Sequence, residues 1–231
     1  MSGFLKRVYR FGSNVVDGNG SMQDILGGKG AGLAEMTMLS IPVPAGFTIT
    51  TDVCRQYLEH GTLPFKLQDE IAQALSWLET SVGRYFNDLD NPLLVSVRSG
   101  APISMPGMMD TILNVGLSDE CLDGFAEATG SQSFALDSYR RLIQMFGSVV
   151  LGVPKHDFDR ILQQIRESDN ATSDSDLSES ALRCTVNAFK SLVLQHTGKP
   201  FPQNPQDQLA MAIEAVFQSW HSERAQCYRR L

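Results

Sequence analysis

Residues 90–117 read DNPLLVSVRSGAPISMPGMMDTILNVGL and are the most informative part of the sequence. Within them, Leu93–Val97 is a nearly continuous apolar run, a pattern typical of a buried strand in the middle of a sheet. Arg98 ends this run, and a cation at the carboxyl end of a buried strand commonly points into a ligand crevice. The fork of N–H donors on an arginine suits phosphate oxygens. A pairing with a nearby carboxylate explains Arg98 equally well on pattern alone.

The strand is followed by a segment rich in methionine, SMPGMMD at residues 104–110. Pro106-Gly107 strongly predicts a turn. Three methionines flank this turn, although methionine normally fills gaps in a core. The pattern fits a flexible apolar loop that covers a ligand, and it fits a packed loop slightly better.

Upstream, residues 26–36 read LGGKGAGLAEM. The glycines remove Cβ atoms where a backbone must approach something closely. A helix is predicted from Lys29 to Leu39, with Leu33, Met36 and Leu39 three residues apart on one helical face. The start of such a helix favours an anion because of its free N–H groups and its dipole, and Lys29 adds a positive charge. The loop is therefore a candidate phosphate site, although it matches neither the P-loop pattern nor the GxGxxG fingerprint. The alternative is a glycine-rich turn with a solvated lysine.

The rest of the pattern predicts an α/β part followed by a helical part. Alternating or β-branched residues predict an edge strand at Arg7–Phe11 and another strand at Gly46–Thr51. From about Asp119 onward, helical periodicity dominates. The other predicted helices cover residues 52–60, 67–82, 120–128, 134–151, 155–168, 179–196 and 206–220. The predicted fold class is α+β, with a small mixed α/β lobe before a mainly helical lobe.

Composition excludes some classes of function. The net charge of −7 argues against sequence-independent binding of nucleic acid, which needs a basic face. It leaves ATP binding open, because a few local cations suffice to hold a phosphate chain on an acidic protein. The four cysteines form no C-x-x-C pair and the four histidines share no metal-ligand spacing, so no metal site is predicted. No apolar run is long enough to cross a membrane, the N-terminus lacks a signal-peptide core, and a cytoplasmic protein with reduced thiols is predicted.

Five blocks that occur in order along the chain resemble the N-terminal, nucleotide-binding region of the pyruvate, phosphate dikinase family. They are LGGKGAGLAEM, IPVPAGFTITTDVC, DNPLLVSVRSGAPISMPGMMDTILNVGL, SYRRLIQMFG and FPQNPQDQLAMAIEAVFQSW. The resemblance covers essentially the whole chain. The block around residues 95–114 is highly specific to that family.

The family interconverts ATP, phosphate and pyruvate with AMP, diphosphate and phosphoenolpyruvate. The resemblance implies an ATP-grasp domain that passes the β-phosphoryl group of ATP to a histidine on a separate swivelling domain, with a TIM barrel that handles pyruvate. It also implies that Lys29 and Arg98 contact the ATP phosphates, in agreement with the charge that phosphoryl transfer develops on oxygen atoms. Weaker candidates for contact with ATP are Gly28, Gly30, Ser99 and Thr111. No residue is assigned a catalytic role.

The resemblance also implies a division into lobes. Residues 1–117 are expected to form the α/β lobe of the ATP-grasp domain, residues 118–200 a helical subdomain, and residues 201–231 the start of the second ATP-grasp lobe. The family's Mg²⁺ ligands, phosphohistidine and pyruvate barrel are not matched here, so we expect that this chain alone does not complete the reaction. Pro102 stands where many members have a second arginine associated with ATP, and it brings neither a charge nor an N–H group.

Three interpretations stay open from the sequence. The chain is a dikinase fragment, either a truncated product or one piece of a split enzyme whose remainder is a separate chain, or it is a non-catalytic module that binds a nucleotide or phosphate. A weaker interpretation is a helical interaction protein with a vestigial loop. Half of an ATP-grasp domain leaves apolar surface uncovered, so either self-association into a homo-oligomer or marginal stability is also expected.

Overall fold

The computed structural model describes residues 6–100 and 110–230. The chain divides into two compact units. Unit 1 comprises Met1–Gly83, Ser99–Met109 and Phe217–Leu231, and unit 2 comprises Arg84–Arg98 and Asp110–Val216. The expected division at residues 117 and 200 concerns the lobes of an ATP-grasp domain and stays a prediction.

Unit 1 contains an antiparallel sheet of three strands in the order β2-β1-β3. The strands are β1 (Val8–Gly12), β2 (Val15–Val16) and β3 (Gly46–Ile49). β1 pairs with β2 on one side and with β3 on the other. It is therefore the central strand of this sheet, and the prediction of an edge strand at Arg7–Phe11 is wrong.

The helix α1 (Gln23–Met38) packs on this sheet. Leu26, Ala31 and Ala34 are buried and form a core with side chains that include Tyr9 and Val16 from the strands. Leu33 and Met36 are only half-buried and Leu39 is 64% exposed, so the apolar face that they form is not the one that packs on the sheet. The remaining helices of unit 1 are α2 (Thr51–His60), α3 (Leu67–Val82), the 3₁₀ turn η2 (Ser219–His221) and α9 (Glu223–Arg229).

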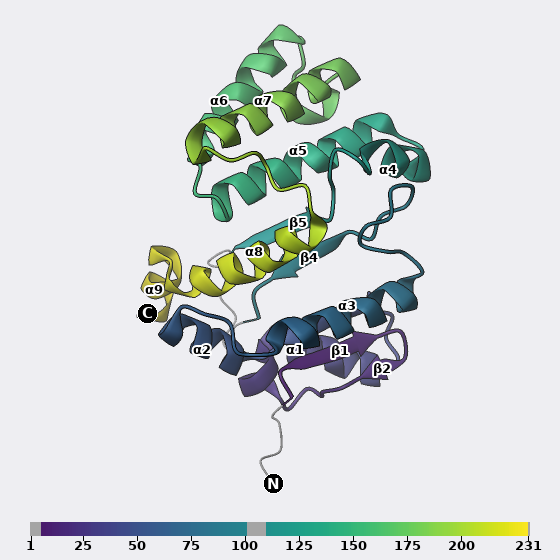
Figure 1. The fold of residues 1–231 in the computed structure, drawn as a ribbon, viewed down its shortest axis with the longest axis vertical. Coiled ribbons are helices and arrows are strands. Elements are labelled where there is room, and N and C mark those ends of the chain that lie inside the picture. The colour runs from purple at the N-terminus through teal and green to yellow at the C-terminus, as the bar shows by residue number, and fades with distance from the viewer. Residues whose placement is uncertain (1–5, 101–109, 231) are drawn as a thin grey trace. The chain divides into compact units, whose positions relative to one another are not determined.

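Unit 2 combines a ribbon of two antiparallel strands, β4 (Val95–Arg98) and β5 (Thr111–Val115), with a set of packed helices (Figure 1). The helices are α4 (Leu122–Thr129), α5 (Gln132–Val149), α6 (Lys155–Ser168), the 3₁₀ turn η1 (Asp174–Asp176), α7 (Glu179–Thr197) and most of α8 (Pro205–Gln218). α5 packs against α4, α7 and β5, and α6 packs against α7. The helical character predicted from about Asp119 onward is confirmed.

Aromatic side chains fill the core of unit 2. Phe158 of α6 and Phe189 of α7 are fully buried, with ring centroids 4.9 Å apart. Phe146 of α5 meets Phe201, which precedes α8, at 5.5 Å. These edge-on contacts hold three helices and the start of α8 together, because large aromatic rings contribute both buried area and specific geometry.

The ribbon differs from the predicted buried strand. β4 pairs with β5, and its residues alternate between half-buried and exposed. Within the described residues it is therefore not the middle strand of a sheet, and that prediction is wrong. The coarser prediction of a mixed α/β protein with a helical second part is confirmed by the helices and small sheets of the two units.

Candidate functional site

The predicted glycine loop coincides with an interruption inside α1. Gly27 has φ 68° and ψ 166°, outside the helical region, while the residues on either side are helical. This combination of dihedral angles is essentially restricted to glycine. Gly28, Lys29 and Gly30 therefore form the first turn of the helix that continues to Met38, which is where the sequence placed the start of a helix.

Gly27 touches the backbone that follows Arg98. A Cβ atom added at Gly27 would lie 1.3 Å from the carbonyl oxygen of Gly100, and one added at Gly100 would lie 3.2 Å from the carbonyl oxygen of Leu26. Both glycines belong to unit 1. The glycine loop and the end of the SVRSG segment are thus in direct backbone contact, a relation that the sequence did not reveal.

The two predicted phosphate-binding cations are both exposed. Lys29 lies two residues after Gly27, and Arg98 lies two residues before Gly100. In the part of the chain that the structure describes, neither side chain makes an ion pair or a hydrogen bond. The carboxylate partner considered for Arg98 is therefore not found among residues 6–100 and 110–230.

Arg98 and Thr111 share one face of the β4–β5 ribbon. They are register partners in the antiparallel pair, so their side chains project to the same side. The preceding pair, Val97 and Ile112, projects to the opposite side, where Ile112 is fully buried. The ribbon therefore turns its apolar side inward and presents Arg98 and Thr111 on its other side. Ser99, the next residue, is 7% exposed.

The other glycines of the loop differ in what they touch. A Cβ atom at Gly30 would lie 2.9 Å from the Thr48 methyl group and 3.0 Å from its hydroxyl oxygen, so the close packing of α1 on β3 explains this glycine. Gly28 is half-buried. A Cβ atom at Gly32 would meet nothing within 4 Å. Pro102 and the methionines of the SMPGMM segment lie outside the described residues.

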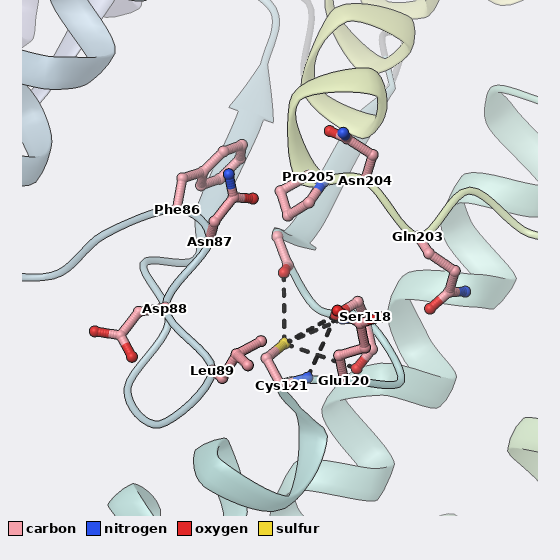
Figure 2. A pocket seen from close by; sticks show the side chains of 11 residues that line it. Phe86, Asn87, Asp88, Leu89, Ser118, Glu120, Cys121, Gln203, Asn204 and Pro205 are labelled. Carbon is pink, nitrogen blue, oxygen red and sulfur yellow. Dashed lines mark hydrogen bonds between the residues drawn. The ribbon is translucent and has the colours of Figure 1, made fainter.

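A separate cavity of about 380 Å³ lies in unit 2 (Figure 2). It is lined by Phe86, Asn87, Asp88, Leu89, Gly116, Ser118, Glu120, Cys121, Gln203, Asn204 and Pro205. Cys121 is 3% exposed, and its thiol accepts a hydrogen bond from the backbone N–H of Ser118, with a sulfur–nitrogen distance of 3.2 Å. Its bonds tie the start of α4 to the preceding turn, which makes it a structural group. None of the predicted ATP-binding residues lines this cavity.

Among residues 6–100 and 110–230, no group of three or more His, Cys, Asp or Glu side chains is arranged to hold a metal ion. In the same ranges, no helix has both the length and the apolar character needed to cross a membrane.

Comparison with known proteins decides the family. The sequence profile of the family described as "Pyruvate phosphate dikinase, AMP/ATP-binding domain" matches residues 23–82 and 58–231 of this chain. The chain belongs to this family. The resemblance seen in the sequence blocks is thereby confirmed.

Individual dikinases show the same relationship. The chain is 49% identical over 228 residues to pyruvate, phosphate dikinase of Clostridium symbiosum, which covers 98% of this chain and 26% of that protein. It is 47% identical over 227 residues to the chloroplastic pyruvate, phosphate dikinase 1 of Zea mays, and the match covers 98% of this chain and 24% of that protein. The Rickettsia typhi enzyme is 46% identical over 228 residues. The chain thus spans about a quarter of the length of the curated relatives that it matches.

Sequence reasoning missed the role of Gly100. The signal was present, because a glycine follows Arg98 and Ser99 directly, but only the folded chain shows that this glycine meets Gly27. Lys29, Arg98, Gly28, Gly30, Ser99 and Thr111 stay predicted contacts of ATP.

Proposed function

We propose that this chain binds ATP, with Lys29 and Arg98 contacting its phosphates, and that it serves as the nucleotide-binding part of a pyruvate, phosphate dikinase. The observation that carries the proposal is the exposure of the two cations and their lack of an acidic partner among the described residues. Their charges are therefore available to an anion. Family membership in an AMP/ATP-binding domain supports a nucleotide as that anion.

The chemistry of the surrounding residues fits a phosphate chain. The first turn of the helix after Gly27 offers backbone N–H groups next to Lys29, and helix N-termini suit phosphate oxygens. Thr111 presents a hydroxyl group on the same side of the ribbon as Arg98. Gly28, Gly30 and Ser99 are further proposed contacts. The ATP-grasp fold, with its lobes at residues 1–117, 118–200 and 201–231, is part of the same proposal.

Mg²⁺ accompanies ATP in this proposal, because a divalent cation neutralises the phosphate chain in phosphoryl transfer. We assign no Mg²⁺ ligand within this chain. The residues proposed here bind and orient the phosphates. We expect no conversion of ATP, phosphate and pyruvate to AMP by these residues alone, and a chain carrying the remaining dikinase domains is the proposed partner.

Calorimetric titration of MgATP tests the proposal. Lys29→Ala and Arg98→Ala should each weaken binding about tenfold to a hundredfold, the usual range for losing a hydrogen bond to a charged group. Lys199→Ala and Arg84→Ala are matched controls, because each removes an exposed cation that is not among the proposed ATP contacts. They should bind MgATP like the wild type. Absence of binding by the wild type, or equal losses in all four variants, would overturn the proposal.

A mixing experiment addresses the partner. AMP formation from ATP, phosphate and pyruvate is measured with the chain alone and after addition of a purified chain that carries the remaining dikinase domains. Turnover is expected only in the mixture. Binding of ATP without turnover in either case would instead support a non-catalytic nucleotide-binding module.

A further inference from the structure

Two separate observations show that position 27, where the chain contacts Gly100, requires glycine. Its φ of 68° with ψ of 166° is a conformation that L-residues with a side chain rarely adopt. Independently, a Cβ atom at this position would lie 1.3 Å from the Gly100 oxygen and 2.3 Å from the Gly100 carbonyl carbon. The obstacle is backbone rather than the end of a flexible side chain, so it cannot rotate away.

The contact lies close in the chain to both proposed phosphate ligands. Gly27 is buried and precedes Lys29 by two residues, while Gly100 follows Arg98 by two residues. Two residues of chain span at most about 7 Å. The covalent chain therefore keeps the backbone of Arg98 within that reach of Gly100, and keeps the backbone of Lys29 within the same reach of Gly27.

We propose that Gly27 and Gly100 are positioning residues of the phosphate site: their backbone contact fixes the loop that carries Lys29 against the segment that carries Arg98. This inference rests on the proposed function. It adds a way in which Lys29 and Arg98, which are far apart in the sequence, are positioned to bind one ligand. Pre-positioning matters because binding groups must be held within about 0.5 Å of their productive geometry, and a misplacement of about 1 Å can cost up to about a hundredfold in the rate of a reaction.

The chain offers a graded series of substitutions for the test. Gly27→Ala forces the two backbones apart. Gly100→Ala is milder, because Gly100 has an ordinary φ and its Cβ atom would lie 3.2 Å from the Leu26 oxygen. Gly32→Ala is the matched control in the same helix, since its Cβ atom would meet nothing within 4 Å.

The first measurement is the affinity for MgATP by calorimetry. We expect Gly32→Ala to bind like the wild type, Gly100→Ala several-fold more weakly, and Gly27→Ala at least about tenfold more weakly. A double-mutant cycle then tests whether Gly100 acts through Arg98. If Gly100 positions Arg98, the loss caused by Arg98→Ala is smaller in the Gly100→Ala background than in the wild type. An Arg98→Ala loss that is unchanged in this background would overturn the positioning role.

The second measurement needs no nucleotide. Hydrogen–deuterium exchange is measured by mass spectrometry in the segment that does not carry the substitution. This segment is residues 95–100 in the Gly27→Ala variant and residues 23–30 in the Gly100→Ala variant. Faster exchange in the unaltered segment is expected, with no such effect in Gly32→Ala. Exchange changes confined to the altered segment would overturn the inference. Absence of MgATP binding by the wild type would instead overturn the proposed function, so the two failures are distinguishable. If Gly27→Ala does not fold, the Gly100→Ala arm decides.

Discussion

The side-chain oxygen of Gln208 accepts a hydrogen bond from the backbone N–H of Gly116 at 2.9 Å, although the two residues are 92 positions apart. The amide nitrogen of the same side chain donates to the carbonyl oxygens of Leu117, at 2.9 Å, and Pro202, at 2.8 Å. Gln208 is fully buried. One carboxamide thus ties the end of β5, the segment before α8 and the first turns of α8 together within unit 2.

Replacing Gln208 with leucine should therefore destabilise the protein strongly. The variant leaves the buried N–H group of Gly116 without this acceptor and removes the donor to two carbonyl oxygens, and a buried unsatisfied group costs about 1–3 kcal/mol. We expect the free energy of unfolding in urea to fall by about 2–4 kcal/mol. Gln206→Leu, an exposed position in the same helix, is the control and should change stability little. Equal stability of the two variants would show that the buried bonds contribute nothing.

A second prediction concerns alkaline pH and Tyr139, whose hydroxyl oxygen lies 3.1 Å from a carboxylate oxygen of Asp119. Burial raises the pKa of the Tyr139 phenol well above its ordinary value, and the negative charge of Asp119 acts in the same direction. In the unfolded chain the phenol loses its proton near pH 10, whereas in the folded chain it keeps it. The unfolded state then binds fewer protons, so stability should fall as the pH rises above about 10.

Urea unfolding of Tyr139→Phe between pH 8 and 11 checks this prediction. The variant lacks the titrating phenol, so its stability should decline less steeply above about pH 10 than that of the wild type. Tyr85→Phe is the control, because Tyr85 is 57% exposed. It should follow the wild-type curve. Parallel curves for the wild type and Tyr139→Phe would contradict the role of the buried phenol.

Helix positions were predictable where local signals suffice. The bounds Leu67–Val82 and Lys155–Ser168 agree with α3 and α6. For α3, the apolar spacing is helical and Gly83, with φ 71°, ends the helix in the left-handed conformation that glycine favours. The spacing runs along the helix itself and the glycine lies at its end, so neither signal depends on the rest of the fold.

Burial and pairing were less predictable because they depend on distant residues. In α1, the spacing of the large apolar side chains does not reveal the buried face, since the helix approaches β3 closely through Gly30 and buries the small Ala31 and Ala34. The apolar run before Arg98 suggested a central strand, but β4 pairs with β5 in a two-stranded ribbon. Period and composition identify apolar residues without identifying their partners.

In the candidate site too, local signals in the sequence indicate some features, and only the folded chain shows others. Motif and charge were enough to single out Lys29 and Arg98, because glycine-rich turns and strand ends are common settings for phosphate-binding cations. The contact between Gly27 and Gly100 joins segments from different parts of the sequence, and no local pattern indicates it. Its recognition required the folded backbone.

The last prediction concerns acid and Asp17. Burial alone would raise the pKa of this carboxyl, but bonds from Arg10 and Lys6 outweigh burial and lower it to about 2. Between its unfolded pKa near 4 and this value, the unfolded state binds more protons, so stability should fall as the pH drops from about 4 to 2. After solvent screening the loss is about 1 kcal/mol. Thermal unfolding of Asp17→Asn should show a shallower acid decline than that of Asp69→Asn, an exposed control. Identical acid declines would refute the assignment.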